Sequence, residues 1–488
     1  MSEIQVEVCF TDKLESVRVG GKPMEIPKAV KAKPVEEWFE PAAGRVKWGG
    51  LGAEIKEMDF GGEKDAAYSF LFNGPEDKKQ EFMECVERFC LGEEAQQETK
   101  KKTVQDYLQE AKKNQQAGNA EMAFQQYMVA ARDYGHPEAQ FEVARCYQNG
   151  MGVKKNEENA VVWYTKAAEQ ECPEAQYELG VCYEAGDGVG KNEAKAAELY
   201  RKAAVQGYAE AQKKLGNCYS YGIGVAKDLE QAFECYSKAA KQGNVKAQYN
   251  LGVCYEYGIG VTKDLAKAVE WYRKSAEQGD ARAQYNLGWC YEYGEGVTKD
   301  LAKAVEWYRK AAERGDAKAQ FALGECYYYG DGIEENNEEA VKWYRKAAEK
   351  DVANAQCMLG ECYYYGYGVE ENNEEAVKWF RKAAEQDVAK AQNLLGDCFY
   401  YGYGVKTNYW EAAKWYEKAA NQGNAKAQCS LGYCHESGRG VEKDLAKAAE
   451  WYRKSAEQGY ARAQCNLGYL YESGRGVEKD LAKAAEWY

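Results

Sequence analysis

The sequence predicts a mainly α-helical protein, a solenoid of ten 36-residue helix-pair repeats that follows a small α+β domain. A chain of 488 residues exceeds the ~250–300 residues that one hydrophobic core usually serves. Within it, an Ala-Gln pair recurs every 36 residues without insertion or deletion, and each unit holds two segments with helical periodicity. The alanines that mark the repeats are Ala139, Ala175, Ala211, Ala247, Ala283, Ala319, Ala355, Ala391, Ala427 and Ala463.

The first helix of each repeat has one stripe of small and apolar residues. If the marker alanine is position 1, then positions 1, 5, 8 and 12 lie within about 60° of each other around a helix. In one unit these positions hold Ala247, Leu251, Cys254 and Gly258. Small residues allow close approach of a neighbouring helix, and glycine at position 12 suits a left-handed helix end. The stripe is therefore the predicted packing surface.

The second helix has start and stop signals in every repeat. One column holds only Asp or Asn, whose side chains can cap the free amides of a first helical turn. An Ala-x-x-Trp-Tyr-x-x-Ala-Ala pattern follows, and Gly243, Gly279 and Gly315 are expected to close this helix. The capping column consists of Asn156, Asn192, Asp228, Asp264, Asp300, Asn336, Asn372, Asn408, Asp444 and Asp480.

These columns resemble the Sel1-like repeat family, a subclass of the tetratricopeptide-like helical repeats. The resemblance covers residues 136–488, with the last repeat incomplete, and departs from the motif only locally, as at Ala144 and His435. It implies a right-handed superhelix that serves as an adaptor or scaffold in protein complexes. One repeat shows the whole motif at Ala247, Leu251, Gly252, Tyr255, Gly258, Gly260, Val261, Asp264, Lys267, Ala268, Trp271 and Tyr272.

The residues before the repeats have a different pattern. Hydrophobic residues alternate in 4–10 and again in 68–72, and Gly20-Gly21 favours a hairpin, so residues 1–92 are predicted to form an antiparallel sheet closed by a helix. The helix would follow Pro75 and present Phe82, Val86 and Phe89 on one face. Residues 93–102 suit a linker, and 103–135 suit one tetratricopeptide-like helix pair.

Few residues suit catalysis or metal binding. The chain has only two histidines, His136 and His435, which disfavours histidine-dependent nucleophilic catalysis and histidine zinc sites. The glycines at 49–52 lack the lysine of a phosphate-binding loop. We therefore expect no enzyme, no cofactor, and no catalytic or metal-binding residue.

Nine of the 17 cysteines share position 8 of the first helix. Cysteine serves well as a small buried residue, and successive copies would lie too far apart for disulfides. A packing role is therefore the favoured interpretation, with redox or metal chemistry as an alternative. The column is Cys146, Cys182, Cys218, Cys254, Cys290, Cys326, Cys362, Cys398 and Cys434.

Charge and hydropathy narrow the class of partner. The net charge is −14, and lysines alternate with glutamates on the helices, so we expect no nucleic-acid partner. No stretch approaches the ~20 apolar residues of a transmembrane helix, and no signal peptide precedes the first strand. With so many cysteines this predicts a reducing, cytoplasmic location.

The predicted binding site is the concave face, at positions 3, 7 and 10 of the first helices in the middle repeats. The repeats vary most in these columns, where aromatic residues stand beside acids, as peptide-binding surfaces require. We expect exposed side chains and a partner segment with basic and apolar residues; the alternative is that some of them pack within the solenoid. The nine residues are Tyr249, Val253, Glu256, Tyr285, Trp289, Glu292, Phe321, Glu325 and Tyr328.

Two further hypotheses remain open from the sequence. Residues 1–92 could hold an enzymatic or ligand-binding activity, with the repeats as a targeting arm. The sequence also stops at Trp487-Tyr488 without a polar capping helix, which predicts fraying or self-association of the last repeat.

Overall fold

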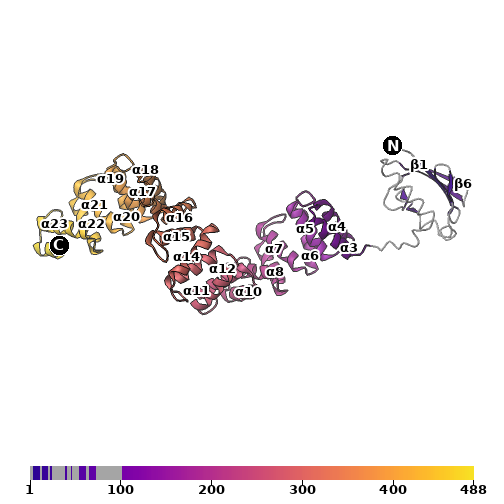
Figure 1. Ribbon diagram of the computed structural model, residues 1–488, viewed down its shortest axis with the longest axis horizontal. Coiled ribbons are helices and arrows are strands. Elements are labelled where there is room, and N and C mark those ends of the chain that lie inside the picture. Colours follow the sequence, from indigo (N-terminus) through magenta and orange to yellow (C-terminus); the bar gives the residue numbers. More distant parts are fainter. Residues whose placement is uncertain are drawn as a thin grey trace. The chain divides into compact units, whose positions relative to one another are not determined.

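The computed structural model describes residues 102–488 and, before them, seven strands (Figure 1). The strands form one antiparallel sheet in the order β3-β2-β1-β7-β6-β5-β4, in which Val6 of β1 pairs with Val19 of β2 and with Phe70 of β7. The helix predicted around Phe82 to Phe89 lies outside the described residues, so the small α+β domain stays a prediction. The strands are β1 (Ile4–Phe10), β2 (Leu14–Val19), β3 (Lys22–Met24), β4 (Phe39–Glu40), β5 (Arg45–Val46), β6 (Glu54–Gly61) and β7 (Asp65–Phe72).

The chain divides into two compact units, residues 1–156 and 157–488. The helices described in the first unit are α3 (Val104–Gln116), α4 (Ala120–Asp133) and α5 (Pro137–Asn149). Thr103 and Asp106 form a capping box at the start of α3, and the Phe124 ring of α4 meets the Tyr147 ring of α5 edge to face at 5.4 Å. The Tyr127 hydroxyl of α4 donates to Gln115 of α3 at 3.0 Å, so α4 contacts both of its neighbours.

The second unit is a stack of helix pairs (Figure 1). Odd-numbered helices from α7 onward are the first helices of their repeats, and even-numbered helices are the second. They are α6 (Glu157–Glu169), α7 (Pro173–Ala185), α8 (Glu193–Val205), α9 (Ala209–Tyr221), α10 (Leu229–Lys241), α11 (Val245–Tyr257), α12 (Leu265–Glu277), α13 (Ala281–Tyr293), α14 (Leu301–Glu313), α15 (Ala317–Tyr329), α16 (Asn337–Glu349), α17 (Ala353–Tyr365), α18 (Asn373–Glu385), α19 (Ala389–Tyr401), α20 (Tyr409–Asn421), α21 (Ala425–Ser437), α22 (Leu445–Glu457), α23 (Ala461–Ser473) and α24 (Leu481–Trp487).

The helix boundaries follow the predicted capping signals. Asp264 accepts a hydrogen bond from the backbone amide of Lys267 at 3.0 Å, and the Asp or Asn of the same column caps each second helix from α8 to α24. Each first helix in this unit ends at a glycine in the left-handed conformation, such as Gly258 with φ 70°. Capping therefore fixes the length of both helices in every repeat.

Within a repeat, a glycine of the first helix lies against the aromatic ring of the second. A Cβ added to Gly252 would come within 2.6 Å of the Tyr272 ring, which is fully buried. The equivalent glycine and ring meet in the other repeats of this unit, with Phe380 in place of tyrosine once. Only glycine lets the two helices approach this closely.

Between repeats, a second glycine and a ladder of glutamines make the contact. A Cβ on Gly260, whose φ is 67°, would lie 2.0 Å from the carbonyl oxygen of Leu229 in the preceding repeat. Buried Gln248 donates to the Ala240 carbonyl at 3.3 Å and accepts from Gln278 at 2.7 Å. These hydrogen bonds satisfy the buried amide while they join successive helix pairs.

The predicted packing stripe is confirmed at positions 1, 5 and 8, whereas Gly258 at position 12 is exposed, and two further positions are buried. Ala, Leu and Cys at positions 1, 5 and 8 are buried in every first helix of this unit up to α21, and so are the glutamine at position 2 and the glycine at position 6. All nine cysteines of the position 8 column are buried, which raises the pKa of the Cys254 thiol to about 12. None of the described helices is long and apolar enough to cross a membrane.

Replacing Gly288 with alanine should destabilise the stack. Its Cβ would lie 2.7 Å from the buried Tyr308 ring, so overpacking should outweigh the gain in helix propensity, with a net loss of about 1–2 kcal/mol in the free energy of unfolding. Urea denaturation followed by circular dichroism measures this loss. The control is Glu306→Ala on the exposed side of α14, and equal stability of both variants would show that the glycine contact is not tight.

Candidate partner-binding face

Three hollows of the second unit lie on the same side of the first helices. One of about 530 Å³ is lined mainly by α11 and α13, one of about 370 Å³ mainly by α9 and α11, and a small one of about 30 Å³ mainly by α19 and α21. The positions that recur in their walls are the residue before the marker alanine, called position 0, and positions 3, 4, 7, 10 and 11. We call the surface formed by these positions the first-helix face.

Five of the nine predicted binding residues line the largest of these hollows. Tyr249, Val253 and Glu256 come from α11, and Tyr285 and Trp289 from α13. The other four occupy the same columns on α13 and α15, and all nine side chains are half-buried. The structure thus places the predicted residues on one face, where their role in binding remains a proposal.

The expectation that these aromatic side chains are exposed is wrong at position 3. The Tyr249 ring lies 5.9 Å from the Tyr272 ring, and the Tyr285 ring lies 5.7 Å from the Tyr308 ring. Position 3 is about 200° from position 1, but the second helix of the same repeat also covers this flank of the first helix. The alternative that some of these side chains pack within the solenoid is therefore correct for this column.

The acids at position 10 accept hydrogen bonds from buried tyrosines of the second helices. The Tyr272 hydroxyl donates to Glu256, and the Tyr308 hydroxyl donates to Glu292. A buried phenol needs such an acceptor, because an unmade hydrogen bond costs about 1–3 kcal/mol. Glu256 and Glu292 therefore support the core, and Glu256 also lines the largest hollow.

Position 11 holds the most exposed aromatic residues of the first helices, and the sequence pattern did not lead us to predict them. Six successive first helices carry a tyrosine there, and these side chains are between 49% and 74% exposed. Each stands directly before the helix-ending glycine and, at about 280° from position 1, faces the same way as position 7. Reading this column together with position 7 would have found it. The six are Tyr221, Tyr257, Tyr293, Tyr329, Tyr365 and Tyr401.

Further tyrosines extend this column into a path of adjoining rings between α15 and α21. The ring centroids of Tyr328 of α15 and Tyr367 are 6.1 Å apart, and those of Tyr364 of α17 and Tyr403 are 5.8 Å apart. Tyr400 of α19 lies 6.3 Å from Tyr433 of α21. The position 11 tyrosines contact both the tyrosine before them and the tyrosine two residues after them, so the aromatic surface continues from one repeat to the next.

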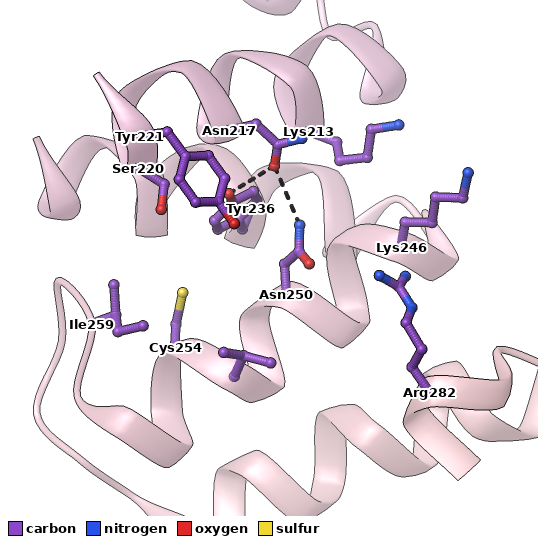
Figure 2. Close-up of a pocket in the computed structure, with 11 residues that line it drawn as sticks. Lys213, Asn217, Ser220, Tyr221, Tyr236, Lys246, Asn250, Cys254, Ile259 and Arg282 are labelled. Atoms are coloured by element: carbon purple, nitrogen blue, oxygen red, sulfur yellow. Dashed lines mark hydrogen bonds between the residues drawn. The ribbon is translucent and has the colours of Figure 1, made fainter. Parts of the chain in front are cut away.

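The hollow between α9 and α11 is basic (Figure 2). Lys213, Lys246 and Arg282 come from three successive first helices and line the same hollow. Lys213 pairs with Glu210 at 2.6 Å, and Arg282 pairs with its neighbour Asp280 at 3.1 Å. Lys246 makes no ion pair among the described residues, although its charge helps to lower the pKa of Glu210, so three cations share the two acids Glu210 and Asp280 at this end of the face.

The middle of the face has acids at position 7 instead. Glu361 pairs with Lys390 at 2.6 Å, where Lys390 is the position 0 residue of the next repeat. Asp397 accepts a hydrogen bond from the Tyr416 hydroxyl at 2.7 Å. Glu325 has neither kind of partner among the described residues, and burial raises its pKa to about 7. The three acids therefore differ in how far their charge is compensated.

The buried tyrosines of the second helices also differ in whether their hydroxyl has a hydrogen-bond acceptor. Tyr308 and Tyr416 have an acceptor, whereas the buried Tyr344 hydroxyl has none among the described residues. In this repeat position 10 holds Tyr328 in place of an acid, and the carboxylate at position 7, Glu325, does not accept from the hydroxyl as Asp397 does from Tyr416. In the next repeat position 10 is again tyrosine, and the second helix has Phe380, which needs no acceptor.

Among the described residues, no three His, Cys, Asp or Glu side chains come together in a way that could hold a metal ion.

Comparisons with known proteins identify relatives of the repeat array. The Sel1 repeat family model matches ten consecutive segments: 137–172, 173–208, 209–244, 245–280, 281–316, 317–352, 353–388, 389–424, 425–460 and 461–488. A solved structure of a protective antigen from uropathogenic Escherichia coli, described as an SLR fold, is 38% identical with a TM-score of 0.75, over 81% of this chain and 85% of that one.

A second solved structure, a Sel1 repeat protein from Oxalobacter formigenes, is 34% identical with a TM-score of 0.49, over 63% of this chain and 89% of that one. The comparison with curated proteins gave no match.

Removing a tyrosine hydroxyl should have opposite consequences in two neighbouring repeats. Tyr308→Phe removes a hydrogen bond to Glu292 and should cost about 1–3 kcal/mol. Tyr344→Phe removes an unsatisfied buried hydroxyl and should leave the free energy of unfolding unchanged or raise it by up to about 1 kcal/mol. Chemical denaturation of both variants gives the comparison, and an equal loss in both would contradict it.

Proposed function

The chain belongs to the Sel1 repeat family, and we propose that it is a protein-binding scaffold whose first-helix face holds an extended segment of a partner protein. The observation that carries this proposal is the column of six exposed tyrosines at position 11. Large exposed apolar surfaces mark interaction sites, and tyrosine is enriched at interfaces because it combines an apolar ring with a hydroxyl.

The spacing of the tyrosines favours an extended segment. Packed helices usually lie about 8–10 Å apart, and an extended chain advances about 3.3 Å per residue. One repeat therefore corresponds to about three residues of the partner. A segment that follows the face would meet a tyrosine at each step, and its apolar side chains could enter the hollows between Tyr249 and Trp289.

The charges on the face suggest which segment fits. Acids at position 7 of α15, α17 and α19 favour a partner with basic residues beside apolar ones. The hollow around Lys246 favours an acidic group at one end of that segment.

The proposal assigns no enzymatic step to the repeats. It also places the protein in a reducing, cytoplasmic compartment. The family supports the first point. The second is supported by the cysteines of residues 102–488, all of which are free.

Photo-crosslinking tests whether the partner occupies this face. Benzoylphenylalanine in place of Tyr293 or Tyr329 should capture a partner through one continuous segment with apolar and basic residues. The control positions are Glu306 and Glu349, exposed on the second helices α14 and α16. Equal capture from the second helices would place the interface elsewhere and contradict the proposal.

An alanine variant of three tyrosines gives a quantitative test with the partner so identified. Tyr257, Tyr293 and Tyr329 are exposed, so their joint replacement should leave helix content and melting temperature close to wild type. Each aromatic hot spot can contribute ≥ ~2 kcal/mol, so affinity should fall more than thirtyfold. Unchanged affinity in a folded variant would rule out this face.

A further inference from the structure

We propose that the first-helix face has a built-in site for one lysine or arginine side chain of the partner segment, located between Glu325 of α15 and Asn354 of α17. The site rests on the proposed function, because the cation would arrive as part of the segment held on this face. Two independent observations point to it: an interruption in a column of cations, and a buried hydroxyl without a partner.

The first observation concerns position 0. In six of seven successive repeats this position holds a lysine or arginine on the face. In the repeat that follows Glu361 this residue is Lys390, whose ammonium lies 2.6 Å from the Glu361 carboxylate. In the repeat that follows Glu325 the residue is Asn354, which has no charge. The column is Lys246, Arg282, Lys318, Asn354, Lys390, Lys426 and Arg462.

Glu325 is consequently left in a negative environment. The carboxylates of Glu292 on α13 and Asp331 in the loop after α15 add to the rise in its pKa that burial causes. Among the described residues no cation opposes this rise, in contrast to Asp397, where Lys426 and Arg462 lower the pKa.

The remaining titratable neighbours of Glu325 carry no positive charge. They are the phenols of Tyr285 and Tyr293 on α13, the thiol of Cys326 on its own helix, and the phenol of Tyr344 on α16. A cation is thus the missing group at this position.

The second observation is the Tyr344 hydroxyl. Tyr344 is fully buried, and its oxygen has no hydrogen-bond partner among the described residues. In two other repeats the residue at position 7 binds this hydroxyl: Asn217 accepts from Tyr236 at 2.8 Å, and Asp397 accepts from Tyr416 at 2.7 Å. In most other repeats the acceptor is the acid at position 10, which Tyr328 replaces here, so Glu325 at position 7 is the carboxylate left to accept from Tyr344, and its charge raises the pKa of that phenol.

An incoming cation would complete this arrangement. An ammonium or guanidinium group donates several hydrogen bonds to the Glu325 carboxylate and keeps it ionised, so that the carboxylate can also accept from the Tyr344 hydroxyl. Tyr328 and Tyr329 stand three and four residues after Glu325, on the same side of α15, and supply ring faces for a cation. A divalent metal suits the position less well, because it needs more oxygen ligands than these acids provide.

Saturation-transfer NMR with a small probe tests the site on the full-length protein. The probe is the capped tripeptide acetyl-Ala-Arg-Ala-amide, and its control replaces arginine with the neutral isostere citrulline. Salt near 0.15 M screens weak attraction to the acidic surface. We expect saturation of the arginine side-chain protons, at least fivefold stronger than for citrulline.

Three variants make the test specific, each checked for folding by thermal melting. Glu325→Gln removes the charge, and Asn354→Lys supplies the missing cation within the chain, so both should abolish the excess signal of arginine over citrulline. Glu361→Gln removes an acid that is already paired with Lys390 and should keep that excess. Loss in Glu361→Gln, or retention in the other two variants, would overturn the proposal.

Binding should also depend on pH. Because the pKa of Glu325 is about 7, the carboxylate is mostly ionised at pH 8 and mostly protonated at pH 6. Arginine binding should therefore be about ten times weaker at pH 6, and a flat profile would count against Glu325. Crosslinking from Tyr329 without arginine binding would refute this site alone, whereas arginine binding without such crosslinking would refute the proposed function alone.

Discussion

The structure of the solenoid depends on the contact between a glycine of the first helix and an aromatic ring of the second. Gly252 brings α11 so close to α12 that the Tyr272 ring is fully buried. A buried ring packs well, but its hydroxyl must then find an acceptor, because water cannot reach it. The nearest source is the first helix, which explains why acids such as Glu256 stand at position 10. Core packing thereby dictates part of the chemistry of the face.

The repeats from 317 to 388 depart from this arrangement together. Tyr328 and Tyr364 replace the acids at position 10, and the turn after each second helix has aspartate where most repeats have glycine. Asp351 has φ 65°, a strained value for a side-chain-bearing residue, but its carboxylate accepts hydrogen bonds from Gln356 and Gln386 at 2.9 Å. These bonds to the glutamine ladder offset the strain. The two repeats are thus internally consistent variants of the others.

The sequence predicted what depends on local patterns. The capping column from Asn192 to Asp480 and the buried stripe of Ala, Leu and Cys follow from helical periodicity and simple hydrogen-bond chemistry. The burial of Tyr249 could not be predicted in this way, because it depends on how the second helix of the same repeat crosses the first. The exposed tyrosines could have been found, since their column is as regular as the others. The unpartnered Tyr344 hydroxyl could not, because it results from a mismatch between residues on two helices.

The close approach of Gly260 to the Leu229 carbonyl has a consequence for how such arrays change. Since backbone atoms touch there, the offset from one helix pair to the next can hardly vary. Gain or loss of one 36-residue unit therefore lengthens or shortens the array by a fixed step. Segments as alike as those starting at Asp264 and Asp300 are natural substrates for unequal recombination. The number of repeats then sets the length of the binding face, so a change in repeat number could fit a longer or shorter partner segment without substitutions inside any repeat.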